Sequence, residues 1–408
     1  MATDTLAQGR LIVSSRLEEL TGELHQVNKT IHSNPELAYE EFIAHDTITA
    51  FLEKLGFKVE RHAWGLGTSF DASIGSGNRQ VIFCAEYDAL PDIGHACGHN
   101  LIATSSIGAF LGAAAAMAKL EITGRIRLLG TPAEEAGGGK ADLIKAGAFD
   151  PPESVLAAIM AHPIPGAHVS DQNCSGLAGV KLIACQGIHT EFKGRTAHAA
   201  GEPWSGVNAL DAAVSAYTNV SLMRQQMHSD DRVHGVFEVG GTVPNVIPDY
   251  TRMHWIIRSP TADGCEKLVG RVSKCFEAGA TAAACEMTLK KSHYYMNLRA
   301  NDGLCKAYVE EMAEYGEYIQ LEMDKPFNAS TDMGNVSHYV PSFHGGIAIP
   351  AESGVAMHNP RFAAAAATDE AHAAAIKAAK GMAMLALRVL LDEEVATKAR
   401  ADFQKRDD

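Results

Sequence analysis

The stretch QVIFCA (80–85) followed by EYDALPDIGHACGHN (86–100) indicates how this chain folds and where it places its polar groups. Residues 80–85 are mostly apolar and predict a buried strand. The following segment holds three acidic residues, two histidines and a cysteine. Ligand-type side chains directly after a buried strand leave three interpretations open: a structural zinc site, a redox thiol or a catalytic metal centre.

The composition is that of an ordinary globular protein with more than one domain. The 408 residues are 46% hydrophobic and 21% charged, and a chain of this length exceeds one simple core. A formal net charge of −14 argues against a nucleic-acid or membrane partner, because both require basic surfaces. The apolar stretch 101–120 contains serine, threonine and glycine, and we expect a buried helix there rather than a membrane span.

Eight cysteines are scattered along the chain without a Cys-x-x-Cys pair. The first twenty residues show neither a long apolar segment nor a small-residue cleavage pattern, so no signal peptide is predicted. Reduced thiols in a cytoplasmic protein are therefore expected. Cys97 differs from the other cysteines because its neighbours are histidines and acidic residues instead of apolar ones.

Alternating helical and strand-like segments predict an α/β domain built on a mostly parallel sheet. This domain would be discontinuous, formed by residues 1–180 and 294–408. Between them, residues 181–293 show the order strand, helix, strand, strand, helix, strand. That order predicts an inserted domain of the ferredoxin-like (βαββαβ) type.

Four segments place ligand-type residues at strand ends or in loops, where an open α/β sheet usually keeps its site. They are GHACGHN (94–100), TPAEEAGGGK (131–140), MAHPIPG (160–166) and MHNPRF (357–362). The side chains that they supply are Cys97, His99, Glu134, Glu135, His162 and His358. Imidazole, carboxylate and thiolate groups suit zinc or manganese. The surplus over a four-ligand structural site suits two ions, with one carboxylate left for catalysis.

Each of these residues has a simpler interpretation when it is taken alone. His162 would more often be a hydrogen-bonded core residue, the paired glutamates a solvated surface, and Cys97 an inert buried thiol. No G-x-S-x-G or H-E-x-x-H motif is present, and residues 137–139 do not form a phosphate-binding loop. A metal centre is favoured because all four segments occupy comparable positions in one α/β pattern. Cys97 and His99 lie two apart, so on an extended loop both can point the same way.

With these residues assembled, the chain resembles the M20 family of metallopeptidases and amidohydrolases, in the branch with a cysteine at the metal site. The resemblance covers nearly the full length and is carried by IHSNPELAYEE (31–41), EYDALP, GHACGHN, TPAEE, AHPIPG, GRTAHAAGEPWSGVNALDA (194–212), GGTVPNVIPD (240–249), STDMGNVSHYVP (330–341) and MHNPRF. Asn100 stands where the plant auxin-conjugate and hippurate hydrolases of the family carry aspartate. In this the chain is similar to the dipeptidase and p-aminobenzoyl-glutamate hydrolase members.

The resemblance implies that residues 1–180 and 294–408 form a catalytic, metal-binding domain, called the metal domain below, and it gives each matching residue of that domain a role. Cys97, His99, Glu135, His162 and His358 would bind two divalent metal ions, with Cys97 as the bridge. Zinc and manganese are the expected ions, and cobalt is possible. Glu134 would be the general base, and Asp88 would orient a ligand through a hydrogen bond.

The inserted domain would then be a lid and dimerisation domain. His198 is expected to reach the active site of a neighbouring subunit and stabilise the oxyanion, while Asn245 and Arg258 contact the substrate. The implied activity is hydrolysis of a small amide, such as a dipeptide or an N-acyl or aminobenzoyl amino acid, by a homodimer. The alternatives are a non-hydrolytic or biosynthetic protein of the same fold, and a monomer with a structural metal.

Overall fold

The computed structural model describes residues 2–169, 173–323 and 325–405. The chain folds into two compact units. One comprises Met1–Lys181, Leu298–Pro326 and Thr331–Asp408, and the other comprises Leu182–Asn297 and Phe327–Ser330. The boundaries expected for the insertion, 181 and 293, differ from those of the second unit by one and four residues.

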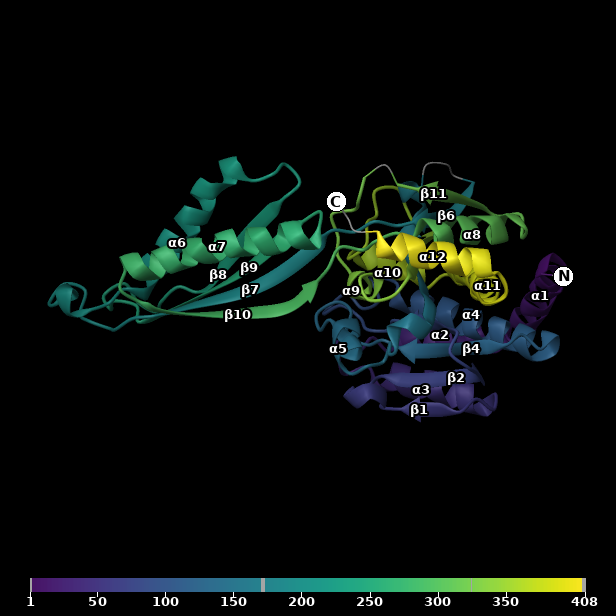
Figure 1. Cartoon of the computed structure of the whole chain (residues 1–408). Coiled ribbons are helices and arrows are strands. Elements are labelled where there is room, and N and C mark those ends of the chain that lie inside the picture. The colour runs from purple at the N-terminus through teal and green to yellow at the C-terminus, as the bar shows by residue number, and fades with distance from the viewer. Residues whose placement is uncertain (1, 170–172, 324, 406–408) are drawn as a thin grey trace. The chain divides into compact units, whose positions relative to one another are not determined.

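The larger unit is built on an eight-stranded, mixed sheet with the order β1-β2-β4-β3-β5-β12-β6-β11. Strands β1 and β2 lie at one end of this sheet, and β6 and β11 lie at the other (Figure 1). Its central strands β4, β3, β5 and β12 run parallel, as the alternating pattern predicts. The antiparallel pairs are β1 with β2, β2 with β4, and β12 with β6. The strands are β1 (Val59–Arg61), β2 (Phe70–Ser76), β3 (Gln80–Ala85), β4 (Gly124–Gly130), β5 (Val155–Pro165), β6 (Cys174–Gly179), β11 (Tyr318–Glu322) and β12 (Ser342–Ile349).

The helices of this unit include two that pack closely together in its core, α4 and α11. The helices are α1 (Ala2–Glu19), α2 (Thr21–Ser33), α3 (Phe42–Lys54), α4 (His99–Leu120), α5 (Gly139–Lys145), α8 (Asp302–Ala313), α9 (Met333–Ser337), α10 (Pro360–Ala366), α11 (Asp369–Leu391) and α12 (Glu393–Gln404). Helix α4 is long and apolar enough to cross a membrane, yet 89% of its most apolar window is buried inside the protein. It is a core helix here, as the small residues of its sequence predict.

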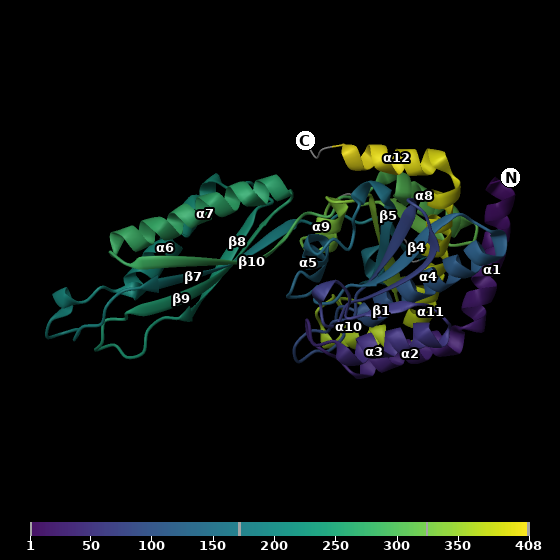
Figure 2. The ribbon, with the colours of Figure 1, turned by 60° about the horizontal axis from the view of Figure 1, so that its bottom comes forward.

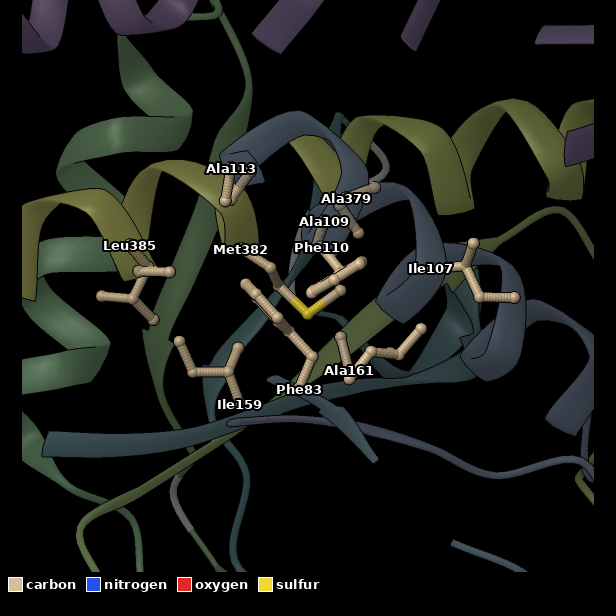
Figure 3. Packing of buried hydrophobic residues seen from close by; sticks show 14 of the residues in the cluster. Phe83, Ile107, Ala109, Phe110, Ala113, Ile159, Ala161, Ala379, Met382 and Leu385 are labelled. Carbon is tan, nitrogen blue, oxygen red and sulfur yellow. The ribbon is translucent and has the colours of Figure 1, made fainter. Parts of the chain in front are cut away.

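Small residues on α4 explain how it packs so closely against its neighbours. A Cβ atom added to Gly108 would lie 3.0 Å from the Cβ of Ala379 in α11, and one added to Gly112 would lie 3.0 Å from Val13. Phe110 of α4 lies in one buried cluster with Phe83 of β3 and Met382 of α11 (Figure 3). This packing holds the strands that carry the site against a rigid layer of helix.

The second unit has the ferredoxin-like architecture that its element order predicts. Its elements are β7 (Ala184–Lys193), α6 (Ala209–Met223), β8 (Arg232–Val239), β9 (Tyr250–Ser259), α7 (Ala262–Ala282) and β10 (Glu286–Tyr295). The strand order is β10-β7-β9-β8, with every pair antiparallel. Helices α6 and α7 cover one face of this sheet (Figure 2), where Trp255 and Phe276 are fully buried.

Candidate metal centre

Two of the expected ligands, Glu135 and His162, and the expected base, Glu134, lie at the carboxyl ends of neighbouring parallel strands. Glu86 and Asp88 follow β3, Glu134 and Glu135 follow β4, and His162 lies near the end of β5. Because the carboxyl ends of parallel strands share one edge of a sheet, side chains from distant parts of the sequence converge there.

Cys97 and His99 flank a tight turn that opens α4, and the segment is not extended as expected. Gly98 between them has a φ of 79°, which favours glycine. A Cβ atom at Gly98 would also lie 2.5 Å from Pro163 Cγ. The turn therefore requires glycine, and it presents Cys97 and the first helical residue, His99, to the same group of ligands.

All five residues predicted to bind metal lie together in two overlapping groups. The ligand atoms of Cys97, His99 and His162 lie within 4.8 Å of one another, and so do those of Cys97, Glu135 and His358. The Cys97 Sγ lies 3.4 Å from His162 Nε2, and Glu135 Oε1 lies 3.3 Å from His358 Nε2. Cys97 is shared by the two groups.

Buried polar atoms at this place show that the residues fit a bound cation. Among the residues that the structure describes, His99 Nε2 and Glu86 Oε2 are buried without a hydrogen-bond partner. A buried polar atom left unpaired is costly. These two atoms, together with the Cys97 thiol, the Glu135 carboxylate and two further imidazoles, form a donor set that suits divalent transition metals.

Asp88 accepts hydrogen bonds from two of the residues expected to bind metal, His99 and Glu135. Its Oδ1 accepts a hydrogen bond from His99 Nδ1 at 2.9 Å, and its Oδ2 accepts one from the Glu135 N–H at 2.9 Å. Burial alone would raise the pKa of Asp88, but the neighbouring His99 and these hydrogen bonds hold it below its usual value. Asp88 thus stays ionised and directs the other ring nitrogen, His99 Nε2, towards the cluster.

The Cys97 thiol and the Glu134 carboxyl group both have raised pKa values. Burial raises the pKa of the Cys97 thiol well above its usual value, whereas a redox thiol needs a lowered one. Burial and the nearby Glu86 carboxylate raise the pKa of Glu134. A carboxyl group of this kind is suited to accepting a proton and returning it.

Sequence reasoning missed a buried ion network beside the ligands. Lys140 Nζ donates to Glu86 Oε1 at 2.5 Å and to Asp332 Oδ1 at 2.6 Å, and all three side chains are fully buried. Two signals in the sequence could have indicated it. Glu86 lies two residues before Asp88, directly after β3, and Lys140 is the last residue of the motif TPAEEAGGGK. The third partner, Asp332, comes from a segment 192 residues away from Lys140.

Glu41 supports the turn that carries Glu134. Its Oε1 accepts a hydrogen bond from the Ala133 N–H at 2.8 Å, and its Oε2 accepts one from the Thr68 hydroxyl at 2.6 Å. Ala133 has a φ of 60°, an uncommon conformation for a non-glycine residue. Burial raises the pKa of Glu41 from 4.5 to about 7, with Thr68 opposing and Asp88 adding to the shift.

Glu41→Gln is expected to flatten the pH dependence of stability in metal-free protein. The Glu41 carboxyl group binds its proton more tightly in the folded than in the unfolded protein. Its contribution to the free energy of unfolding is therefore complete below pH 4.5 and is lost as pH rises through about 7. A full shift of this size corresponds to about 3 kcal/mol. Glutamine still accepts from the Ala133 N–H but cannot ionise. Urea unfolding at pH 5 and pH 8 measures the effect, and parallel pH profiles of parent and variant would contradict it.

In the smaller unit, His198 and Asn245 lie on adjoining loops. His198 forms an isolated β-bridge with Val246, and the Asn245 carbonyl accepts a hydrogen bond from the Ala199 N–H. The exposed His198 ring accepts the Ala200 and Gly201 N–H groups at Nδ1, at 3.2 and 3.0 Å. A neutral ring must then carry its proton on Nε2, which makes this nitrogen a hydrogen-bond donor.

Arg258 lies in β9, where its guanidinium donates to Ser330 Oγ at 2.9 Å. On the same sheet, His189, Glu238 and His254 form a further group of potential ligands. Arg252 Nε already lies 2.7 Å from the Glu238 carboxylate, and another Arg252 nitrogen lies 3.1 Å from His189 Nδ1. We therefore assign no metal to the group formed by His189, Glu238 and His254.

A cluster of thiol, imidazole and carboxylate donors at the carboxyl edge of a parallel sheet, next to a glutamate of raised pKa, defines a metal-dependent hydrolase. Residues 82–384 match the model of peptidase family M20/M25/M40. The chain belongs to this family and is a metal-dependent amidohydrolase of the M20 type.

Several known proteins are similar to this chain over nearly its whole length. It is 38% identical to a Xaa-Arg dipeptidase from Mus musculus, covering 96% of this chain and 91% of the relative. It is 26% identical to a subunit of the p-aminobenzoyl-glutamate hydrolase from Escherichia coli, covering 92% and 90%. A dinuclear metal-binding peptidase of the M20 family from Bacillus subtilis shares the fold with a TM-score of 0.68 at 20% identity, covering 91% of this chain and 99% of that one.

Proposed function

We propose that this protein is a homodimeric, two-metal dipeptidase that cleaves small peptides ending in arginine or a similar basic residue. The observation that carries the proposal is the pair of overlapping ligand groups that share Cys97, with Glu134 beside them. The choice of substrate follows the 38% identity to a Xaa-Arg dipeptidase over 96% of the chain. A small dipeptide or other N-acyl amino acid also suits the family to which the chain belongs.

The metal domain would hold the ions and move the proton. Cys97, His99, Glu135, His162 and His358 would bind two zinc or manganese ions, with cobalt possible, and Cys97 would be the bridge because both groups contain it. When bound, such ions polarise the amide carbonyl and lower the pKa of water to roughly 7. Glu134 would accept the proton of the attacking water and pass it to the leaving amine.

The smaller unit would complete the site of a second subunit. The protonated Nε2 of the partner's His198 would donate to the oxyanion, an interaction worth about 3–4 kcal/mol in other hydrolases. Asn245 and Arg258 would contact the substrate, with Arg258 as the candidate for its terminal carboxylate.

Exposed apolar side chains on the smaller unit support a dimer. Strand β8 is an edge of its sheet, and Val236 and Phe237 on it are 61% and 40% exposed. Leu222 of the adjacent helix α6 is 71% exposed. Unpaired edge strands and apolar patches of this kind commonly meet a second chain. We also propose a cytoplasmic location, which the eight free cysteines support.

Incubation of metal-reconstituted protein with a mixed substrate panel tests the proposed activity. The panel holds dipeptides ending in arginine, lysine or alanine, together with p-aminobenzoyl-glutamate, N-acetyl amino acids and auxin conjugates, and mass spectrometry reads the products. We expect release of arginine and lysine, and none with a Glu134→Gln control. Intact substrates despite two bound ions would instead support the non-hydrolytic or biosynthetic alternative.

A further inference from the structure

We propose that Glu86 is a sixth metal-binding side chain and that it biases the centre towards manganese relative to zinc. This inference deepens the metal centre of the proposed function and rests on it. The Glu86 carboxylate is fully buried. Its Oε2 lies 3.6 Å from His99 Nε2 and has no hydrogen-bond partner among the residues that the structure describes.

The position of Oε2 is that of a metal donor. The ligand atoms of Glu86, His99 and Glu134 lie within 4.8 Å of one another. His99 Nε2 likewise has no hydrogen-bond partner within the described part of the chain, and it also belongs to the group formed with Cys97 and His162. A cation held by His99 Nε2 would therefore have the free oxygen of Glu86 as a neighbour.

The other carboxylate oxygen of Glu86 is fixed in place. Oε1 accepts from Lys140 Nζ at 2.5 Å, and the same ammonium donates to Asp332 Oδ1 at 2.6 Å. The backbone N–H of Lys140 donates to the second oxygen of Asp332 at 2.8 Å. With Oε1 anchored in this way, Oε2 is held facing the cluster.

The charge of this network also calls for a cation. Glu86 and Asp332 bring two carboxylates to a single ammonium, so that ionised groups leave one negative charge in excess in the buried interior. A buried charge needs a partner. Of the four carboxylate oxygens, Oε2 of Glu86 is the one that faces the ligands. A divalent ion at this place would satisfy the charge and the unpaired oxygen together.

A second carboxylate ligand changes which metals the centre prefers. The five ligands already described comprise one thiolate, three imidazoles and one carboxylate, a set that suits zinc. Carboxylate oxygens suit manganese better than thiolate does. Loss of the Glu86 carboxylate should therefore weaken binding of manganese more than binding of zinc.

Chelator competition with metal-free protein tests the proposal without any substrate. We expect Glu86→Gln to lose at least about tenfold in affinity for one of two Mn²⁺ ions, since even groups that only contact a ligand change metal affinity by roughly 10–100-fold. Its affinity for Zn²⁺ should fall less. Glu86→Asp keeps the charge beside Lys140 but is one methylene shorter, and it should show the same selective loss if the glutamine variant does not fold.

Asp332→Asn is the matched control, because it removes the other carboxylate from the same lysine without touching the oxygen that faces the cluster. We expect a smaller loss of Mn²⁺ affinity than in Glu86→Gln. Equal losses in the two variants, or a folded Glu86 variant that binds Mn²⁺ within twofold of the parent, would overturn the proposal. Selective Mn²⁺ loss in a protein that hydrolyses nothing on the panel would uphold this inference and reject only the dipeptidase activity.

Discussion

Glu134→Gln is expected to keep both metal ions and to lose about a thousandfold in kcat. Removal of a positioned general base typically costs 10²–10⁴-fold. The Glu134 side chain is nearly fully buried, and its Oε2 lies 3.9 Å from His99 Nε2. Glu134 is therefore next to the expected ligands, but it belongs to neither of the two ligand groups that contain Cys97. Glutamine keeps the shape of the side chain but cannot accept the proton of water. Steady-state kinetics and metal analysis of the same preparation measure both parts of the prediction.

Glu135→Gln is the control that the chain itself provides. Glu135 is the next residue, but its Oε1 lies 3.3 Å from His358 Nε2 and belongs to a ligand group with Cys97. This variant should lose metal as well as activity. If the Glu134 variant instead loses metal, or retains more than a tenth of the parent kcat, the assignment of Glu134 as the base is wrong.

The parts of the fold that could be predicted are those that depend on local patterns. The apolar run 80–85 forms β3, fully buried as expected, and the order of elements in the insertion gives the ferredoxin-like sheet. The convergence of ligands also followed from the sequence, because parallel strands align their carboxyl ends. The turn at Gly98 was not predicted, since the residue that leaves no room for a side chain there, Pro163, belongs to strand β5.

The contacts that could not be predicted join residues far apart in the sequence. Glu41 meets the Ala133 N–H across 92 residues, and Lys140 meets Asp332 across 192. Neither glutamate nor lysine is usually buried, so periodicity alone assigns such residues to the surface. Only the packed structure shows that each charged group is enclosed with a partner. These are also the contacts that support the loop carrying Glu134 and that hold Glu86 against the ligands.

His198→Ala is expected to lower kcat by about 10²–10³-fold, the usual effect of removing one oxyanion donor. The backbone N–H groups of Ala200 and Gly201 hold Nδ1 of His198, and this fixes the proton on Nε2 in the neutral ring. Metal content should be unchanged, because the expected ligands all lie in the other unit. Kinetics at a concentration where sedimentation shows the parent and the variant in the same oligomeric state measure the effect.

Mixed dimers decide whether His198 serves its own subunit or the partner. A dimer of one Glu134→Gln chain and one His198→Ala chain contains one site with an intact Glu134 that can receive the partner's His198. If the histidine acts across the interface, this mixed dimer should recover about half of the parent activity, although both homodimers are nearly inactive. A dimer of an unaltered chain and a chain with both substitutions provides the control. This control holds one complete subunit, yet both of its sites are defective if His198 acts across the interface, and it should then be nearly inactive. High activity in the control, together with none in the first mixed dimer, would instead show that His198 acts in the site of its own subunit.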